Sequence, residues 1–284
     1  MDKLIEYLAC FGGMEEKIEL DFFKNLEENI EMIYCDRFRE SENFISPGYL
    51  MEYPYRDILI SIAKSDGKVL NVFKRAGVGE SFGGSILSEL KKEKIIDIVP
   101  SREEPFRGKG TQIKKELRRY RIQPKVRFRM PYMRFWFGFV EPFRNSLGRG
   151  ECKKLMDHFT LHKERVFYLV FEQLSTDLLI DRFARTDPIV ESGSMWDFRN
   201  EFDILCYTES GKTILGECKY SSRKICRNEL SKLKEKAEIS NISVDFYALF
   251  SKSAFSRELD QINDERVLLF GLEDFRTMIE ENRS

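Results

Sequence analysis

Residues 200–220, NEFDILCYTESGKTILGECKY, decide the expected fold of this chain. Apolar and polar side chains alternate over residues 200–208 and again over 213–220, which predicts two β-strands. The residues between them, ESGK at 209–212, have the composition of a tight turn. We therefore expect an antiparallel β-hairpin here.

The hairpin carries side chains suited to phosphodiester chemistry. Successive side chains of a strand alternate between its faces, so Glu217 and Lys219 project from one side, and Asp203 joins them if the register allows. Two carboxylates on one face repel each other unless a cation lies between them, and Mg²⁺ or Mn²⁺ prefers such oxygen ligands. Lys219 would then orient an attacking water or stabilise charge on a phosphate.

An exposed hairpin with one wet face would show the same alternation. The spacing favours a nuclease-type site over that simpler explanation, because an Asp, a turn and a Glu-x-Lys follow one another. Glu172 lies upstream of them on a helix expected over residues 151–180.

The elements expected around the hairpin define an α/β fold. After the helix at 151–180, Pro188 and the Ser-Gly-Ser at 192–194 predict a loop that leads into the hairpin. A basic amphipathic helix at 227–238, strands at 243–251 and 267–270, and a last helix at 272–281 follow. This order predicts a sheet covered by helices.

The first half of the chain is expected to be mostly helical. Helices are predicted at 3–10 and 15–29, the second with Phe22 and Phe23 on its inner face. Three more are expected at 55–64, 69–75 and 81–94, before strands at 95–99 and 125–130. Three helices followed by a two-stranded ribbon are the outline of a winged helix, a DNA-binding fold.

A basic tract lies between the two expected ribbon strands. Residues 102–129 hold eleven Lys and Arg against three Glu, although the whole chain has a net charge of only −1. Such an excess can neutralise nucleic-acid phosphates, and a solvated helix without a partner is the alternative. The predicted contacts are Lys91, Lys92, Arg107, Lys109, Lys114, Lys115, Arg118, Arg119, Lys125 and Arg127.

Several motifs resemble a known family. Trp196, the EFDI at 201–204 and the GECK at 216–219 are similar to the C-terminal domain of archaeal-type ATPases, a PD-(D/E)XK nuclease-superfamily module. RYRI at 119–122 and MRFWFGFVEP at 133–142 resemble the connector after the winged helix of those proteins, and FGGM at 11–14 resembles the segment after their ATPase core. The likeness covers nearly the whole chain.

The resemblance implies roles for individual residues. Asp203 and Glu217 match the metal-binding carboxylates, Lys219 the catalytic lysine, and Glu172 the acidic residue of the first core helix. Glu201 either ligates metal or points to solvent.

The nucleotide-binding half of the family is missing from this sequence. Residues 211–213 (GKT) end like a phosphate loop, but Cys206 stands where its first glycine belongs, and a strand follows instead of a helix. The glycines at 77, 79, 83 and 84 likewise lack the context of a dinucleotide fingerprint. We therefore expect no nucleotide cofactor.

Other candidate ligands carry weaker signals. His158 and His162 lie four residues apart on a helix, a zinc-compatible spacing, but no third ligand is near in the sequence, so packing or surface histidines are the favoured interpretation. The six cysteines form no CxxC pair, so reduced thiols in a cytoplasmic protein are expected. No apolar run approaches the length of a membrane span.

The sequence thus predicts three regions: a helical segment at 1–50, a winged helix at 51–145 and a PD-(D/E)XK restriction-endonuclease-like domain at 146–284. The expected function is a DNA endonuclease that depends on Mg²⁺ or Mn²⁺, with DNA as partner. The alternative is a non-catalytic DNA-binding or adaptor protein with an inactive nuclease fold. A homodimer and a separate ATPase are further partner hypotheses.

Overall fold

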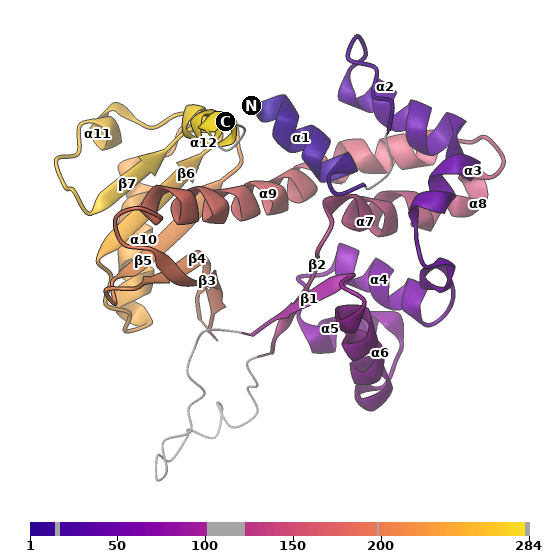
Figure 1. The fold of residues 1–284 in the computed structure, drawn as a ribbon, viewed down its shortest axis with the longest axis horizontal. Helices are drawn as coiled ribbons and strands as arrows, with labels where there is room; N and C mark the ends of the chain where they lie inside the picture. Colours follow the sequence, from indigo (N-terminus) through magenta and orange to yellow (C-terminus); the bar gives the residue numbers. More distant parts are fainter. Residues whose placement is uncertain (15–17, 101–122, 198, 282–284) are drawn as a thin grey trace. The chain divides into compact units, whose positions relative to one another are not determined.

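The computed structural model describes residues 1–14, 18–100, 123–197 and 199–281. The chain divides into two compact units, an N-terminal unit of Lys3–Pro100 with Gln123–Phe167, and a C-terminal unit made mainly of Tyr168–Ser284. Helix α9 (Lys153–Phe183) contributes to both units, because the division falls within it (Figure 1). The boundary expected between residues 145 and 146 lies just ahead of this helix.

Short helices build the first part of the N-terminal unit. In chain order they are α1 (Asp2–Phe11), α2 (Leu26–Ile30), the π-helix η1 (Glu31–Asp36), α3 (Phe38–Ser41), and the 3-10 turns η2 (Glu42–Phe44) and η3 (Gly48–Met51). The helix predicted at 15–29 is wrong over residues 18–25, which are not helical.

A capping box explains where α2 begins. The Asn25 side chain accepts the Glu28 N–H at 2.9 Å, and the Glu28 carboxylate accepts the Asn25 N–H at 2.7 Å. This reciprocal pair satisfies the first free N–H groups of the helix and fixes its start at Leu26. Phe22 and Phe23 therefore lie outside the helix, 86% and 103% exposed, and form no inner face.

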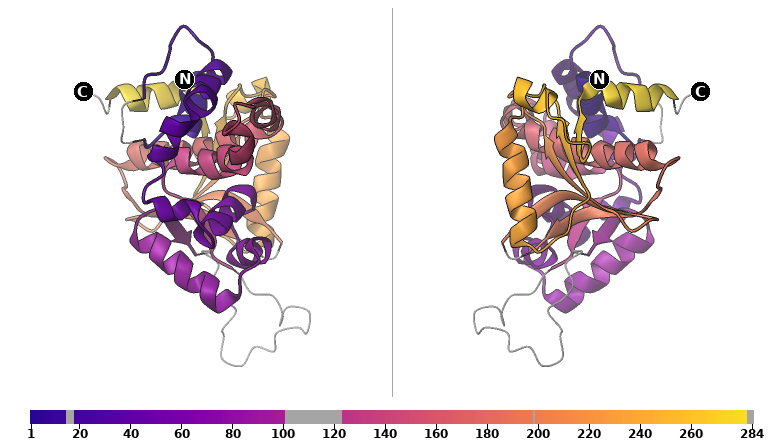
Figure 2. Two further views of the ribbon diagram at one scale, coloured as in Figure 1. Left: turned by 90° about the vertical axis from the view of Figure 1, so that its right-hand side faces the viewer. Right: turned by 90° about the vertical axis from the view of Figure 1, so that its left-hand side faces the viewer.

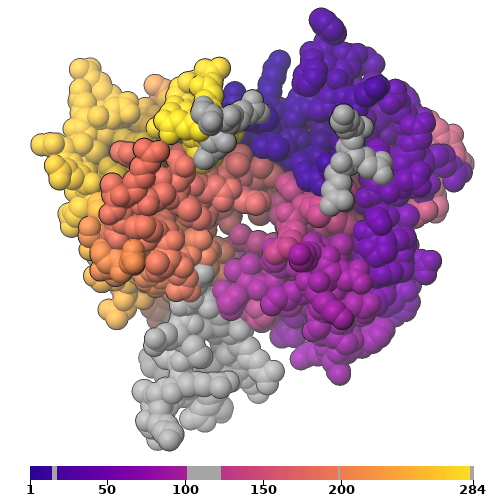
Figure 3. All heavy atoms as spheres, in the orientation of Figure 1, coloured from indigo at the N-terminus to yellow at the C-terminus, as the bar shows by residue number. Residues whose placement is uncertain are grey.

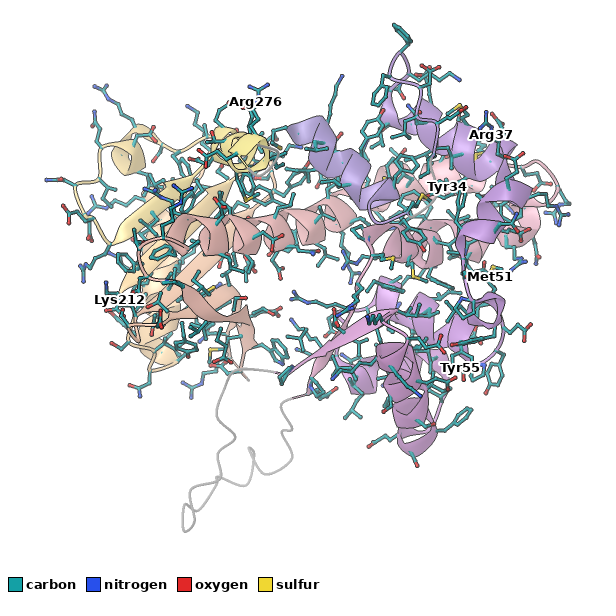
Figure 4. The ribbon with its side chains drawn as sticks, viewed as in Figure 1. Tyr34, Arg37, Met51, Tyr55, Lys212 and Arg276 are labelled. Atoms are coloured by element: carbon teal, nitrogen blue, oxygen red, sulfur yellow. A yellow bond between two sulfur atoms is a disulfide. The ribbon has the colours of Figure 1, made fainter. Side chains whose placement is uncertain are left out.

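Aromatic rings form the core of this unit. The buried Tyr34 (labelled in Figure 4) stacks on Phe11 with ring centroids 5.7 Å apart, and it contacts Phe135 at 5.1 Å. The Tyr34 hydroxyl donates to the Cys10 carbonyl at 2.8 Å, so the ring is buried without an unpaired polar atom.

In the space-filling view the indigo N-terminal helices adjoin the purple helices α4 (Tyr55–Lys64), α5 (Val69–Ala76) and α6 (Glu80–Lys92) (Figure 3).

The expected three helices and ribbon are present. They are α4 (Tyr55–Lys64), α5 (Val69–Ala76), α6 (Glu80–Lys92), β1 (Ile96–Val99) and β2 (Lys125–Phe128), and the two strands pair antiparallel. Gly77 ends α5 with a φ of 69°, a left-handed conformation that glycine adopts without strain.

A buried carboxylate joins this ribbon-and-helix segment to the helices that follow it. These are α7 (Pro131–Phe135), the π-helix η5 (Trp136–Val140), η6 (Glu141–Phe143) and α8 (Arg144–Leu147). Glu141 is fully buried, and its oxygens lie 2.6 Å from Arg56 Nε, 3.7 Å from Arg144 and 3.2 Å from Trp136 Nε1. A buried charge of this kind is tolerated because it is paired and hydrogen-bonded.

A disulfide also lies within the N-terminal unit. Cys35 and Cys152 are bonded, with Cα atoms 5.7 Å apart, and the other four cysteines form no disulfide. The expectation of six reduced thiols is therefore wrong for this pair. Sequence spacing could not reveal it, because the two residues are 117 positions apart.

The C-terminal unit contains a five-stranded mixed sheet in the order β3-β4-β5-β6-β7. Its strands are β3 (Ile189–Trp196), β4 (Glu201–Thr208), β5 (Thr213–Lys219), β6 (Phe246–Ser251) and β7 (Val267–Phe270). The first three pair antiparallel, and β5, β6 and β7 pair in parallel. The predicted hairpin is thus the middle of the sheet.

Helices cover both faces of this sheet (Figure 2). On one face α10 (Arg227–Ile239) packs Leu230 and Leu233 against Leu215 and Leu249. On the other, Phe171 of α9 contacts Phe275 of α12 (Leu272–Glu281), with ring centroids 5.2 Å apart. The short α11 (Arg257–Asp260) lies between β6 and β7 in the sequence. The predicted α/β arrangement is confirmed.

The loop expected at residues 192–194 is wrong, because these residues belong to the edge strand β3. Register shifts interrupt the pairing of β3 with β4 between Ile189 and Glu191 and between Gly193 and Met195. Irregular edge strands tolerate glycine and serine, so the loop-like composition marks bulged pairing.

Candidate functional site

The candidate site lies where β4 and β5 cease to pair. The last paired residues are Ile204 and Gly216. Beyond them, Asp203 Oδ2 accepts the backbone N–H of Cys218 at 2.8 Å, so a side chain replaces the next ladder bond. A Cβ on Gly216 would lie 2.9 Å from Ile204 Cβ, so glycine lets the strands approach just before they separate.

Glu217 and Lys219 share one face of β5, as predicted. Lys219 Nζ lies 2.5 Å from Glu217 Oε1, and Lys236 Nζ from α10 lies 3.3 Å from Glu217 Oε2. Glu217 is buried at 9% exposure, and each of its oxygens faces an ammonium group. This face is also the one that packs on α10.

Cys218 points to the opposite face, as expected for its position between Glu217 and Lys219. It is buried, and the Ser175 side chain on α9 hydrogen-bonds to it. Burial, followed by the charge of Asp203, raises the pKa of the Cys218 thiol well above its ordinary value. The cysteine is therefore a small packed residue rather than a nucleophile.

Asp203 is a carboxylate with a strongly raised pKa. Burial raises its pKa to about 7, with further contributions from the charges of Glu217 and Glu172. Hydrogen bonds from Tyr168 and from the Cys218 N–H act in the opposite direction. Three carboxylates therefore interact at this end of the sheet, and the site favours a proton or another cation at Asp203.

Helix α9 supplies the other half of the site. Tyr168, Glu172 and Ser175 lie at i, i+4 and i+7 along it, so they share a helix face. The buried Glu172 lies close enough for its charge to affect both Asp203 and Tyr168. Burial and the Asp203 charge raise the pKa of Tyr168, which keeps its hydroxyl protonated as a donor to Asp203.

Lys219 is held as an ammonium ion. Burial lowers its pKa, but the hydrogen bond and charge of Glu217, followed by the charges of Asp203 and Glu229, raise it more. Glu229 lies 3.8 Å from Lys219 and also pairs with Lys232 at 2.9 Å. Lys219 is thus charged and positioned by acidic groups from two elements.

The donor set suits a hard divalent ion. Asp203 and Glu217 offer carboxylate oxygens, which Mg²⁺ and Mn²⁺ prefer, and burial together with the charge of Glu217 raises the pKa of Asp203. Across the described residues, no group of three or more His, Cys, Asp or Glu side chains is arranged to hold a metal. Mg²⁺ is commonly bound by one or two carboxylates together with water and substrate phosphate oxygens, and these residues fit that mode.

Tyr168, Lys236 and Glu229 also belong to the site, and none of them was predicted from the sequence. Tyr168 could have been found from its spacing of four residues before Glu172 on the predicted helix. Lys236 and Glu229 lie on the basic helix at 227–238, but no pattern in the sequence distinguishes them from the other charged residues of that helix. Glu201, whose role was open, is exposed at the start of β4.

The predicted nucleic-acid contacts differ in their exposure to solvent. Lys91 and Lys92 are exposed at the end of α6, and Arg127 is half-buried on β2. Lys125 is 5% exposed, so its buried side chain does not suit the expected phosphate contact. The remaining contacts lie outside the described residues: Arg107, Lys109, Lys114, Lys115, Arg118 and Arg119.

The two histidines pack among aromatic rings. His158 contacts His162, with ring centroids 4.5 Å apart, and also Phe139 and Phe143. Burial lowers the pKa of His158, and the neighbouring His162 and Lys64 lower it further. Their surroundings agree with packing histidines.

In the described part of the chain, no helix has the length and apolarity to cross a bilayer.

Comparison with known proteins adds one family match. The family model DUF234, described as archaeal and bacterial proteins of unknown function, matches residues 136–238. This range holds α9 and the β4–β5 hairpin with Glu172, Asp203, Glu217 and Lys219. No curated protein matches the chain.

One solved structure aligns with much of the chain. It is the refined half-complex from a tetradecameric assembly of Thermococcus gammatolerans McrB AAA+ hexamers with bound McrC. The identity is 11% and the TM-score 0.29, over 94% of this chain and 78% of that chain.

Proposed function

We propose that the chain is a metal-dependent DNA endonuclease, with a PD-(D/E)XK restriction-endonuclease-like domain and a winged helix that brings it to DNA. The observation that carries the proposal is the meeting of Asp203, Glu217 and Lys219 where β4 and β5 separate. Burial, followed by the charges of Glu217 and Glu172, raises the pKa of Asp203 to about 7, which favours a cation beside this carboxylate.

In this proposal each residue of the site has a defined role. Asp203 and Glu217 would hold Mg²⁺ or Mn²⁺, and Glu172 would ligate it directly or through water. The bound ion would polarise the scissile phosphate and activate water for hydrolysis. Lys219, held as an ammonium ion, positions the attacking water or offsets negative charge that develops on the phosphate. Tyr168 fixes the orientation of Asp203 through its hydrogen bond.

The winged helix would consist of α4, α5 and α6 with the β1–β2 ribbon. Its helix α6 would enter a major groove, and the basic tract at 102–129 would follow the DNA backbone. Lys91 and Lys92 support this role because both side chains are exposed at one end of α6.

A nuclease assay tests the proposal. Supercoiled, linear and branched DNA would be incubated with the protein in Mg²⁺ or Mn²⁺, beside Asp203→Ala and Lys219→Ala variants. Cleavage that needs metal and is lost in both variants, but kept in an Asp260→Asn control, is the expected result. Asp260 is an exposed carboxylate on α11 outside the site.

One observation favours a second candidate, a non-catalytic DNA-binding or adaptor protein. Both oxygens of Glu217 are already paired with lysines, Lys219 and Lys236. In that case every DNA would be bound without cleavage, and neither variant would change the result. If the chain instead acts with a separate ATPase, a pull-down from native extract should recover an NTPase, and recovery of none would count against that partner.

A further inference from the structure

A basic cavity lies in the N-terminal unit where α4 ends. Its volume is about 700 Å³, and it is lined by residues from α4, the loop after it, α5 and α9. Four of its seven lining side chains are basic and one is acidic. The lining residues are Lys64, Ser65, Asp66, Asn71, Lys74, Arg75 and Arg165.

The basic side chains of this cavity lack acidic partners. Among the described residues, Lys64, Lys74 and Arg75 form no side-chain hydrogen bond or ion pair with one another or with any other group. Asp66, the one acidic residue of the lining, is engaged elsewhere, since it lies 3.8 Å from Lys68 and accepts the Asn71 amide at 3.1 Å. The positive charge is therefore not neutralised within the cavity.

Lys64 is the most constrained of these cations. It is half-buried, and burial together with the charge of Arg75 lowers its pKa. Two like charges held close in a partly desolvated place destabilise each other. A bound anion would remove that penalty for both.

Arg165 fixes the wall of the cavity. Its guanidinium donates to the carbonyls of Lys64 (3.3 Å), the last residue of α4, and of Ser65, the C-cap residue after it. The C-terminal end of a helix carries a partial negative charge, and Arg165 covers it. Exposed α4 carbonyls therefore do not repel an anion that enters beside Lys64.

We propose that this cavity is a binding site for a phosphate group, held by Lys64, Lys74 and Arg75. Lysine presents a compact charge, and the planar guanidinium of arginine can bind two phosphate oxygens at once. The volume of about 700 Å³ lies within the range of small-molecule sites, so it accommodates a diphosphate as well as a single backbone phosphate. The site is separate from the carboxylates of the C-terminal unit and does not depend on nuclease activity.

The test compares two sources of phosphate on the full chain without divalent metal. Inorganic pyrophosphate binding is measured by calorimetry, and binding of a labelled DNA duplex by fluorescence anisotropy. The test variant is Lys74→Gln/Arg75→Gln, which removes two exposed charges from α5. The control is Lys153→Gln/Lys154→Gln, which removes two exposed charges from α9 outside the cavity.

We expect the test variant to bind at least one ligand about tenfold more weakly or worse, because two charge-assisted contacts are lost, and the control to stay within about twofold. Weaker binding of pyrophosphate alone identifies a free phosphate compound as the ligand. Weaker binding of DNA, with or without pyrophosphate, identifies a nucleic-acid backbone. Affinities that match the control for both ligands would overturn the proposal.

Two further measurements keep this result interpretable. Circular dichroism reports whether the double variant folds, and if it does not, the single variants Lys74→Gln and Arg75→Gln replace it. Asp203→Ala should keep the wild-type affinity for pyrophosphate, because Asp203 lies in the other unit. The cavity can therefore fail its test while the nuclease proposal stands, and the reverse also holds.

Discussion

Replacing Asp203 with asparagine should stabilise the protein at neutral pH. Burial and two neighbouring carboxylates raise the pKa of Asp203 from 3.8 to about 7, which disfavours its charged form in the folded state. One pKa unit corresponds to about 1.4 kcal/mol, so a shift of about three units sets an upper limit of about 4 kcal/mol. Asparagine keeps an oxygen that can accept the Cys218 N–H.

The direction in which this stability difference changes with pH follows from proton binding to Asp203. Below about pH 4 Asp203 is protonated in both folded and unfolded chains, so the carboxyl group brings no penalty. Between about pH 4 and pH 7 the unfolded chain releases this proton while the folded chain retains it, so the wild type loses stability. Above pH 7 the full penalty persists. The advantage of Asp203→Asn should therefore grow from small at pH 4.5 to about 2–4 kcal/mol at pH 8.

Urea unfolding in EDTA at pH 4.5, 6 and 8 measures this difference. The exposed Asp260, in the same unit, provides the matched Asp260→Asn control, which should change stability by less than about 0.5 kcal/mol. An Asp203→Asn protein that is less stable than wild type at pH 8, or whose advantage does not change with pH, would refute the electrostatic argument.

Three further results are expected. Millimolar Mn²⁺ should raise the unfolding temperature of wild type at pH 7.5 but not of Asp203→Asn, and equal shifts would place the bound metal elsewhere. Gly216→Ala should destabilise by about 1–3 kcal/mol, because its Cβ would crowd Ile204, whereas Gly48→Ala, with open space around it, should be near neutral in urea unfolding. Glu141→Ala should reduce stability by about 2–4 kcal/mol, since it leaves Trp136 Nε1 without its acceptor, and a change under 1 kcal/mol in the same assay would contradict this.

The central elements were predictable because local patterns determine them. Helix α4, strand β7 and helix α12 begin and end at the residues that periodicity indicates, and the β4–β5 hairpin is found where the alternation predicts it. Glu217 and Lys219 share a face because strand geometry requires it. These predictions depend on neighbours in the sequence alone.

The failures depend on contacts between distant residues or on competing local bonds. Phe22 and Phe23 fit a helical spacing, but the capping box at Asn25 starts the helix at Leu26, after both of them. The Cys35–Cys152 disulfide and the pairing of Lys236 with Glu217 join positions that no sequence period relates. Lys125 has the charge of a phosphate contact, yet its side chain is buried.

The participation of α9 in both units has a practical consequence for dissecting the protein. Phe159 and Phe167 of this helix pack in the N-terminal unit, whereas Phe171 packs against Tyr220 and Phe275 of the C-terminal unit. A fragment that starts at residue 146 would carry the first half of α9 with its apolar side chains uncovered, and such fragments tend to aggregate. A fragment that ends at residue 145 would lack those same rings from its core, so neither isolated piece is expected to report the properties of the intact chain.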